Sequence, residues 1–186
     1  GNMVMRNPKV KAMVVAALIA ALYTAVGLAL APIGFGAVQL RVAEAFTLLA
    51  VFSPVGVWGI SVGCLLTNLI GTAMGVTIGI DILVGTLATV LAGICSYALR
   101  NARFKGLPVL SALCPVIFNA LIVGAELTII IGWNIRIFLL NMLSVGIGEA
   151  AACFLLGLPL VYALERAGLD QRLFGQSSSP KSPIRE

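Results

Sequence analysis

The sequence predicts an all-α integral membrane protein built as a bundle of six transmembrane helices. Of its 186 residues, 60% are hydrophobic and 10% are charged, whereas a soluble domain carries about 25% charged residues. No charged residue occurs in 12–31, 45–80, 82–99 or 106–125, and about 20 apolar residues are enough to cross a bilayer core as a helix. These runs lack the strict alternation of a barrel strand, so helices are the structure that satisfies their backbone in lipid.

The expected spans are separated by helix-breaking or basic segments. Pro32 ends the first span, Ser53-Pro54 divides the second from the third, and the glycines of 71–79 follow the third. A basic segment, 100–106, and Gly132-Trp133-Asn134 divide the remaining three. The six spans are about 10–31, 36–53, 54–72, 81–100, 107–131 and 135–165. The last is long enough to tilt or to project beyond the bilayer.

The spans form one transmembrane domain, 10–166, between a cytoplasmic N-terminal segment, 1–9, and a polar tail, 167–186. The tail is rich in Pro and Ser and is expected to be disordered. With both ends in the cytoplasm, ten of the 12 Lys and Arg residues lie inside and only Arg41 and Arg136 lie outside. This distribution obeys the positive-inside rule and predicts a multi-pass protein of the cell membrane.

The composition excludes several classes of function. The net charge of +5 is explained by the basic segments between spans, so a nucleic-acid-binding surface is not indicated. The chain has no histidine, and no HExxH, GxSxG or phosphate-loop motif is present, so neither an enzyme nor a metal site is expected. Its four cysteines, which fall inside the spans, are expected to be reduced packing residues.

Polar side chains inside the spans are the candidates for function. A charged group at the centre of a span costs at least about 2.5–3.5 kcal/mol on insertion scales, so it is retained for a reason. The polar residues at such positions are Gln39, Arg41, Glu44, Asn68, Asp81, Asn119, Glu126, Arg136, Asn141 and Glu149.

The spacing of these residues suggests one polar cavity. Asn119 and Glu126 are seven residues apart and share a helix face, and Asn134 and Asn141 have the same spacing on the next span. Two facing stripes of this kind would surround a chamber with amides and a carboxylate. The alternative is that these groups only pair with one another, and for Glu149 a link between helices is as good an explanation as ligand contact.

Residues near the expected outer boundary also have two explanations. Arg41 and Glu44 are three residues apart, so they could form a local ion pair or face the cavity. Trp58 and Trp133 lie near span ends, where tryptophan anchors helices at the lipid interface. Trp133 is next to Asn134 at the expected mouth, where a planar ligand could stack on its ring.

Small residues repeat on two spans. Ala17, Ala21 and Ala25 recur every four residues on the first span, and Ala16 and Ala20 form a neighbouring pair. Gly59 and Gly63 repeat in the same way on the third. Such spacing allows a second helix to approach closely in lipid. That second helix belongs either to this bundle or, for the first span, to a partner subunit.

The stretch from Val38 to Ala45, with its QxRxxEA pattern, resembles the QueT family, as do the Phe-Ser-Pro54 break and the GCxxxN pattern of 63–68. The resemblance extends over roughly 10–165. The family consists of substrate-binding S-components of energy-coupling factor (ECF) transporters, taken to import queuosine precursors. It implies a ligand site near the outer face and no cofactor in this chain, because ATP is used by partner subunits. The partners would be a transmembrane coupling protein, facing Ala17, Ala21 and Ala25, and two cytoplasmic ATPases.

The ligand that the resemblance implies is queuine or a related 7-deazaguanine. Its guanine-like edge has two adjacent N–H donors, which Glu126 could accept, while Asn68, Asn141 or Gln39 could bind the carbonyl and ring nitrogens. Trp133 could stack on the ring, and Asp81 or Glu149 could bind an amine on the 7-substituent; Arg41 and Glu44 complete the expected site. Two alternatives remain: an S-component for another vitamin-like molecule, and a small channel or assembly subunit outside the ECF class.

Overall fold

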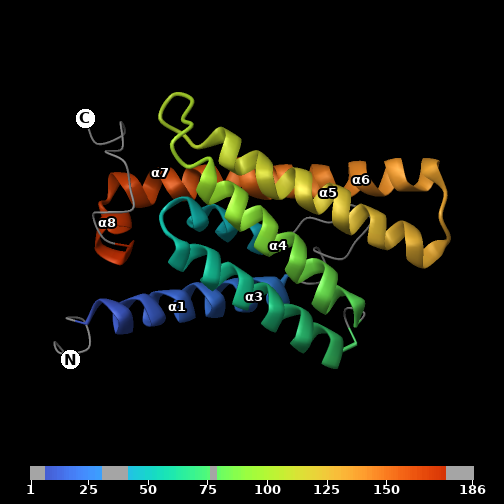
Figure 1. Ribbon diagram of the computed structural model, residues 1–186, viewed down its shortest axis with the longest axis horizontal. Helices are drawn as coiled ribbons and strands as arrows, with labels where there is room; N and C mark the ends of the chain where they lie inside the picture. The colour runs from blue at the N-terminus through green and yellow to red at the C-terminus, as the bar shows by residue number, and fades with distance from the viewer. Residues whose placement is uncertain (1–6, 31–41, 76–78, 175–186) are drawn as a thin grey trace.

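A computed structural model describes residues 7–30, 42–75 and 79–174, and every regular element in this part of the chain is helical (Figure 1). The elements that correspond to the first five expected spans are α1 (Pro8–Ala29), η2 (Val42–Val51), α3 (Pro54–Ala73), α4 (Ile80–Ala98) and α5 (Val109–Ile131). The sixth is a continuous run of α6 (Ile135–Ala150), the π-helical η3 (Ala151–Gly157) and α7 (Leu158–Arg166). A short helix, α8 (Leu169–Phe174), follows it.

Four helical runs in the described part are long and apolar enough to cross a membrane. They are Pro8–Ala29, Pro54–Ala73, Val109–Ile131 and the 32-residue run Ile135–Arg166. The apolar helices Val42–Val51 and Ile82–Ala98 are shorter. The described part of the chain is therefore all-helical and has four helical runs capable of spanning a membrane, while the six-span count and the orientation of the ends remain predictions.

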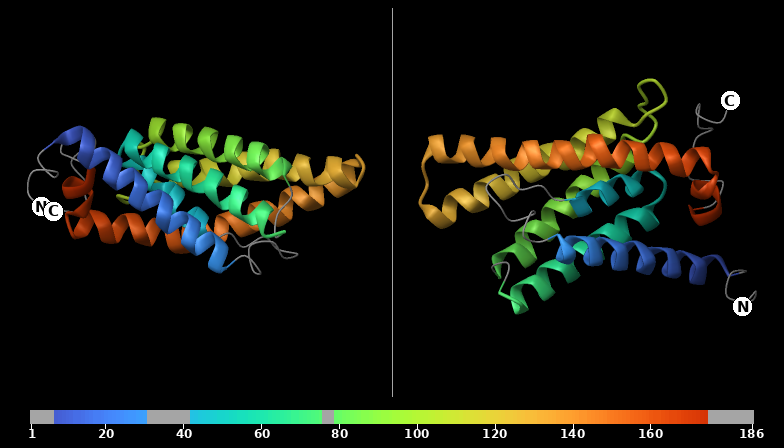
Figure 2. Two further views of the ribbon diagram at one scale, coloured as in Figure 1. Left: turned by 90° about the horizontal axis from the view of Figure 1, so that it is seen from below. Right: turned by 180° about the vertical axis from the view of Figure 1, so that it is seen from behind.

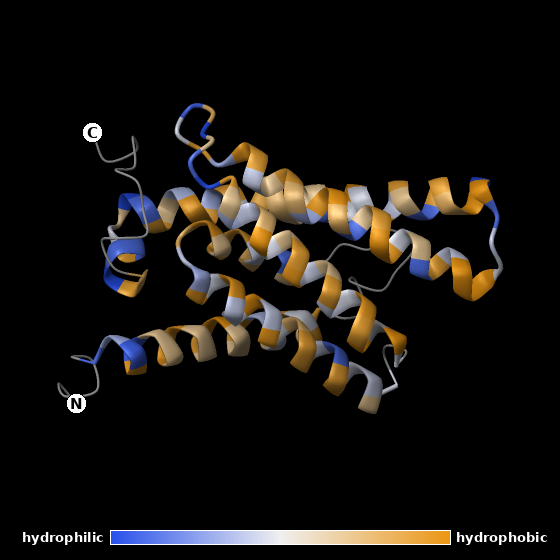
Figure 3. Ribbon diagram, viewed as in Figure 1, coloured by the Kyte–Doolittle hydropathy of each residue, from blue (hydrophilic) through white to orange (hydrophobic). Residues whose placement is uncertain are grey.

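The helices alternate in direction between two ends of the molecule (Figures 1 and 2). The start of α1, the α4–α5 loop and α8 lie at one end, here called the inner end, and the α5–α6 loop lies at the other, the outer end. Hydrophilic residues are concentrated at the inner end, and apolar residues cover most of the helix lengths (Figure 3). This distribution suits a bundle whose middle is surrounded by lipid.

Local sequence explains where three helices begin. Asn7, Ser53 and Asn134 are N-caps whose side chains accept hydrogen bonds from backbone N–H groups two residues later, at 2.9–3.1 Å. Asn134, expected to share a cavity face with Asn141, is therefore engaged in capping α6. The π-helical segment ends just before Pro159, and an extra residue in the turn relieves the clash that proline makes in a regular helix.

Glycines bring α1 and α3 together. A Cβ atom at Gly63 would lie 2.8 Å from the Cβ of Tyr23, and one at Gly59 would lie 2.7 Å from the Cβ of Ile19. Any side chain at these positions would force the helices apart. The two glycines thus pack inside this bundle, whereas Ala17, Ala21 and Ala25 are exposed on another face of α1.

The inner half of the bundle is closed by an apolar core. Leu48, Phe52, Ile60 and Val161, from η2 and its turn, α3 and α7, are fully or almost fully buried there. Phe174 of α8 stacks on Phe52 with ring centroids 5.4 Å apart. Residues 169–174 of the expected tail thus form a helix that packs on the bundle through Phe174.

Candidate functional site

The polar residues expected to be functional lie mostly inside the bundle. Glu149 and Asn119 have no exposed surface, and Glu44, Glu126 and Asn68 are at most 9% exposed. Their burial between helices avoids the cost of facing lipid. Gln39, Arg41 and the side chain of Asp81 lie outside the described residues, so their part in the site stays a prediction.

Glu44 is held by two hydroxyl groups. Tyr23 of α1 donates a hydrogen bond to its Oε1 at 2.5 Å, and Thr47, one turn further along η2, donates to its Oε2 at 2.8 Å. The thiol of Cys153 in η3 also lies 3.8 Å from the Glu44 backbone oxygen. Glu44 therefore links α1, η2 and η3, while the expected ion pair with Arg41 falls outside the described part of the chain.

Glu149 lies close to this cluster. It precedes Cys153 by four residues in one continuous helix, so both side chains are on the same face, toward η2. Two acids from distant parts of the sequence, Glu44 and Glu149, thus approach the same thiol. The spacing of residues in the sequence did not indicate that Glu44 and Glu149 lie close together. The buried partner of Glu44 could have been anticipated from Tyr23 in the middle of the first span, since a buried Tyr hydroxyl requires a hydrogen-bond partner.

Asn68 lies at the contact between α3 and α4. Its Nδ2 is 3.5 Å from the sulfur of Cys64, which also accepts a hydrogen bond from the hydroxyl of Thr89 at 3.2 Å. A Cβ atom at Gly85 would meet this amide nitrogen at 3.0 Å. The absence of a side chain at Gly85 therefore makes the space that Asn68 fills.

Asn141 is bound across the α5–α6 hairpin. The hydroxyl of Thr128 donates to the backbone oxygen of Gly124 at 2.7 Å, and therefore accepts the hydrogen bond from Asn141 Nδ2 at 3.1 Å. The side chain of Asn141 is therefore oriented with its amide nitrogen toward α5. Glu126 lies on the same helix, two residues before Thr128, and is 5% exposed. Residues two apart on a helix point in different directions, so a shared site for Glu126 and Asn141 stays a prediction.

Asn119 and Glu126 belong to one helix face, as their spacing predicts, and both are buried. Asn119 donates through Nδ2 to the backbone oxygen of Pro115 at 2.9 Å. Proline has no N–H to give to the oxygen of Ser111, and that oxygen accepts the hydroxyl of Ser96 instead, at 2.8 Å. The polar groups of α5 are therefore used partly to hold α4 and α5 together.

The two tryptophans lie at opposite ends of the bundle and are largely exposed. Trp133, at the outer end, is 61% exposed, and its ring is 5.2 Å from that of Phe138. Trp58 lies in the inner part of α3. Both positions suit interfacial anchors, and a ligand stacked on Trp133 remains a prediction.

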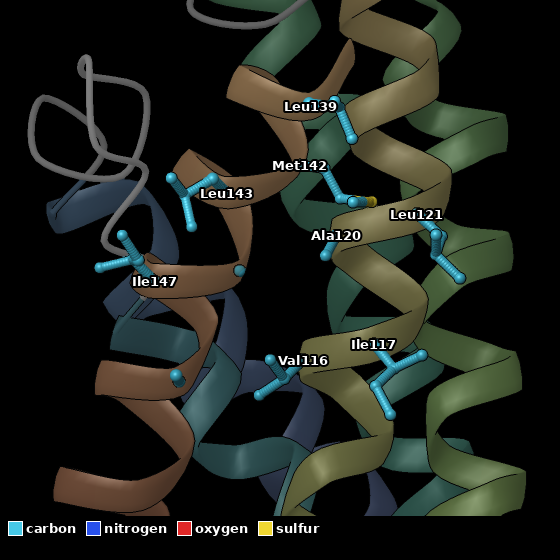
Figure 4. Close-up of a pocket in the computed structure, with 10 residues that line it drawn as sticks. Val116, Ile117, Ala120, Leu121, Leu139, Met142, Leu143 and Ile147 are labelled. Atoms are coloured by element: carbon cyan, nitrogen blue, oxygen red, sulfur yellow. The ribbon is translucent and has the colours of Figure 1, made fainter. Parts of the chain in front are cut away.

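An apolar groove of about 570 Å³ lies between α5 and α6 (Figure 4). Val116, Ala120, Met142 and Gly146 are among the residues that line it, together with larger aliphatic side chains. None of the expected substrate-binding residues contributes to this groove. Its surface suits lipid tails or another helix, and the polar chamber expected near the outer end remains a prediction.

Apolar helices in a lipid-compatible bundle, with acids and amides buried between them, define a polytopic membrane protein whose interior is adapted to polar groups. A family model described as QueT transporter matches residues 13–166, so the chain belongs to the QueT transporter family. The QueT family is a transporter family and not an enzyme family, and membership of it indicates small-molecule uptake across a membrane. No curated protein and no solved structure matches the chain.

Proposed function

We propose that this protein is the substrate-binding S-component of an ATP-driven ECF importer for a queuosine precursor, queuine or a related 7-deazaguanine. The observation that carries the proposal is membership of the QueT family over residues 13–166. The buried acids and amides of the bundle support it, because a heterocycle with several N–H and C=O groups requires such partners.

Glu126 is the residue that we assign to the donor edge of the ligand. A carboxylate accepts two parallel N–H groups, which a guanine-like edge provides. Asn141 lies on the facing helix, and its amide nitrogen is already bound to Thr128, so its oxygen is the group directed to a ligand donor. Asn68, Gln39 and Trp133 complete the proposed ring contacts.

A second acid would bind an amine on the 7-substituent. Glu149 and Asp81 are the candidates, since a cation is favoured where the spans contain acids and few basic residues. Glu44 already accepts hydrogen bonds at both oxygens. In the proposed mechanism it therefore braces α1 against η2, and it does not need to touch the ligand.

The exposed face of α1 supports the proposed partner. Ala17, Ala21 and Ala25 are exposed, whereas the neighbouring Ala20 is buried at the contact with α3. A transmembrane helix of the coupling protein could therefore pack closely on the three alanines without disturbing the bundle. Two cytoplasmic ATPases would then drive release of the ligand in the plasma-membrane complex.

An S-component for another vitamin-like molecule would use the same fold with different pocket residues, so it is the second candidate. A channel is less well supported. A channel needs a polar path through the bundle, and the described core of the inner half is apolar around Leu48, Phe52 and Ile60.

The test is ligand binding by the purified protein, measured by calorimetry with queuine and with 7-aminomethyl-7-deazaguanine. The variant Glu126→Gln should weaken binding about tenfold or more, because a bidentate charged contact becomes a single neutral one. Asp170→Asn makes the same chemical change at the inner end and should leave the affinity unchanged. Tight binding of thiamine, biotin or a flavin in place of deazaguanines would contradict the proposed substrate. Uptake that persists without the ATPases would contradict the ECF class.

A further inference from the structure

A second hollow lies on the outside of the bundle, between α3 and α4. It measures about 320 Å³ and is lined by Pro54, Val57, Trp58, Ser61, Val90, Ile94 and Tyr97. The two helices touch behind it, where a Cβ atom at Gly93 would lie 3.1 Å from Ile60. Trp58 and Ile94 are 69% and 54% exposed, so the groove is open to the surroundings of the bundle along its length.

A cationic side chain stands at the inner rim of this groove. The guanidinium of Arg100 lies 4.0 Å from the centroid of the Tyr97 ring, and its NH1 donates to the Tyr97 backbone oxygen at 2.9 Å. Tyr97 itself lines the groove. The charge of Arg100 is therefore placed where the apolar groove meets the inner boundary of the bundle.

Arg100 differs in its partners from the neighbouring Arg103. Arg103 forms an ion pair with the buried Glu165 at 2.9 Å, so its charge is compensated within the protein. Within the described residues no carboxylate lies within ion-pair distance of Arg100. Arg103 also donates to the backbone oxygen of Arg100 at 3.0 Å, which fixes the backbone that carries the uncompensated charge.

We propose that this groove binds one anionic phospholipid, with an acyl chain between α3 and α4 and the phosphate on Arg100. The apolar lining suits a lipid tail, and Trp58 and Tyr97 are residue types that favour the headgroup level. Basic residues beside a groove between transmembrane helices attract acidic headgroups on the cytoplasmic side. An apolar partner helix would leave Arg100 without a counter-charge, so the lipid fits the site better.

The site is separate from the proposed substrate chamber, so the two proposals are tested independently. The purified protein is placed in bilayer discs with equal amounts of phosphatidylglycerol and phosphatidylcholine, and the lipids that it retains are counted by native mass spectrometry. We expect phosphatidylglycerol to be retained in preference to phosphatidylcholine. The variant Arg100→Gln should lower this preference about fivefold or more.

Arg172→Gln is the matched control, because it removes the same charge from an exposed position in α8 at the same end of the molecule. It should leave the lipid preference unchanged. Ser61→Phe should fill the groove and reduce retention while Arg100 is intact. Each variant's melting temperature in phosphatidylcholine discs identifies a change that merely unfolds the protein.

Three results would overturn the proposal. The first is equal retention of both lipids by the unmodified protein, and the second is an equal effect of the Arg100 and Arg172 changes. The third is displacement of the retained lipid by millimolar glycerol 3-phosphate, which would make the site one for a free phosphate compound.

Discussion

The hydrogen bond between Tyr23 and Glu44 gives the sharpest test of how this bundle is held together. Tyr23→Phe removes one hydroxyl and keeps the ring that packs on Gly63. The lost bond is buried and its acceptor is a carboxylate: Tyr23 is 4% exposed and Glu44 is 1% exposed. Hydrogen bonds to charged groups contribute about 1.5–3 kcal/mol, and the change also leaves one oxygen of Glu44 unsatisfied.

We therefore expect Tyr23→Phe to destabilise the protein by about 2 kcal/mol. For a chain of this size, that corresponds to a fall of about 4–8 °C in melting temperature. The measurement is thermal unfolding in mild detergent. Unfolding is detected by the reaction of the buried cysteines Cys64 and Cys153 with a fluorescent maleimide. These thiols are protected by the packing of α3 and η3 and become reactive when the bundle opens.

The control is Tyr162→Phe, whose hydroxyl accepts a hydrogen bond from Arg166 on the exposed face of α7. Exposed interactions of this kind contribute about 0–1 kcal/mol, so the melting temperature should change little. Equal effects of the two substitutions would show that the Tyr23–Glu44 bond does not brace α1 against η2. The structural explanation of the buried Glu44 would then be wrong.

Three further predictions follow from the packing and from the ion pair of the inner loop. Gly63→Ala should destabilise the bundle by about 1–3 kcal/mol, because its Cβ would clash with α1; thermal unfolding should show no such effect for Gly79→Ala, which has no atom within 4 Å. Asn141→Ala and Thr128→Ala should be non-additive, with a coupling of about 0.6–1.7 kcal/mol in a double-mutant cycle, and full additivity would contradict the bond between them. Arg103→Gln should increase hydrogen exchange in the α4–α5 loop, because it leaves a buried carboxylate of α7 without its cation; unchanged exchange would show that the ion pair does not order the loop.

The element ranges were accessible from the sequence because they depend on local composition. The charge-free runs give helices at nearly the expected positions, and Ser53 and Asn134 mark two helix starts through their capping side chains. The run predicted for 135–165 is observed as Ile135–Arg166. The described helix Val42–Val51 lies within the second expected span, 36–53, and the start of that span lies outside the described residues, so it stays a prediction.

The contacts of the candidate site were less accessible. Asn119 and Glu126 share a face as predicted, because a helix fixes the angle between residues seven apart. The pairing of Asn141 with Thr128, by contrast, depends on how two helices are rotated against each other, and that is set by the close contact at Gly124. The packing of α8 on Phe52 was not predicted for a different reason: α8 has too few apolar residues to give a periodic signal in the sequence.

The sequence by itself determined that this chain belongs in lipid, where its helices run, and which polar residues are expensive to bury. These properties follow from the transfer of each segment out of water, a cost that is summed residue by residue along the chain. Only the tertiary structure decided that Tyr23 donates a hydrogen bond to Glu44 and that α1 packs on Gly59 and Gly63. It also decided that Ala17, Ala21 and Ala25 stay exposed. Such contacts join residues distant in the chain, and they exist only after the rotation and register of each helix are fixed by its neighbours.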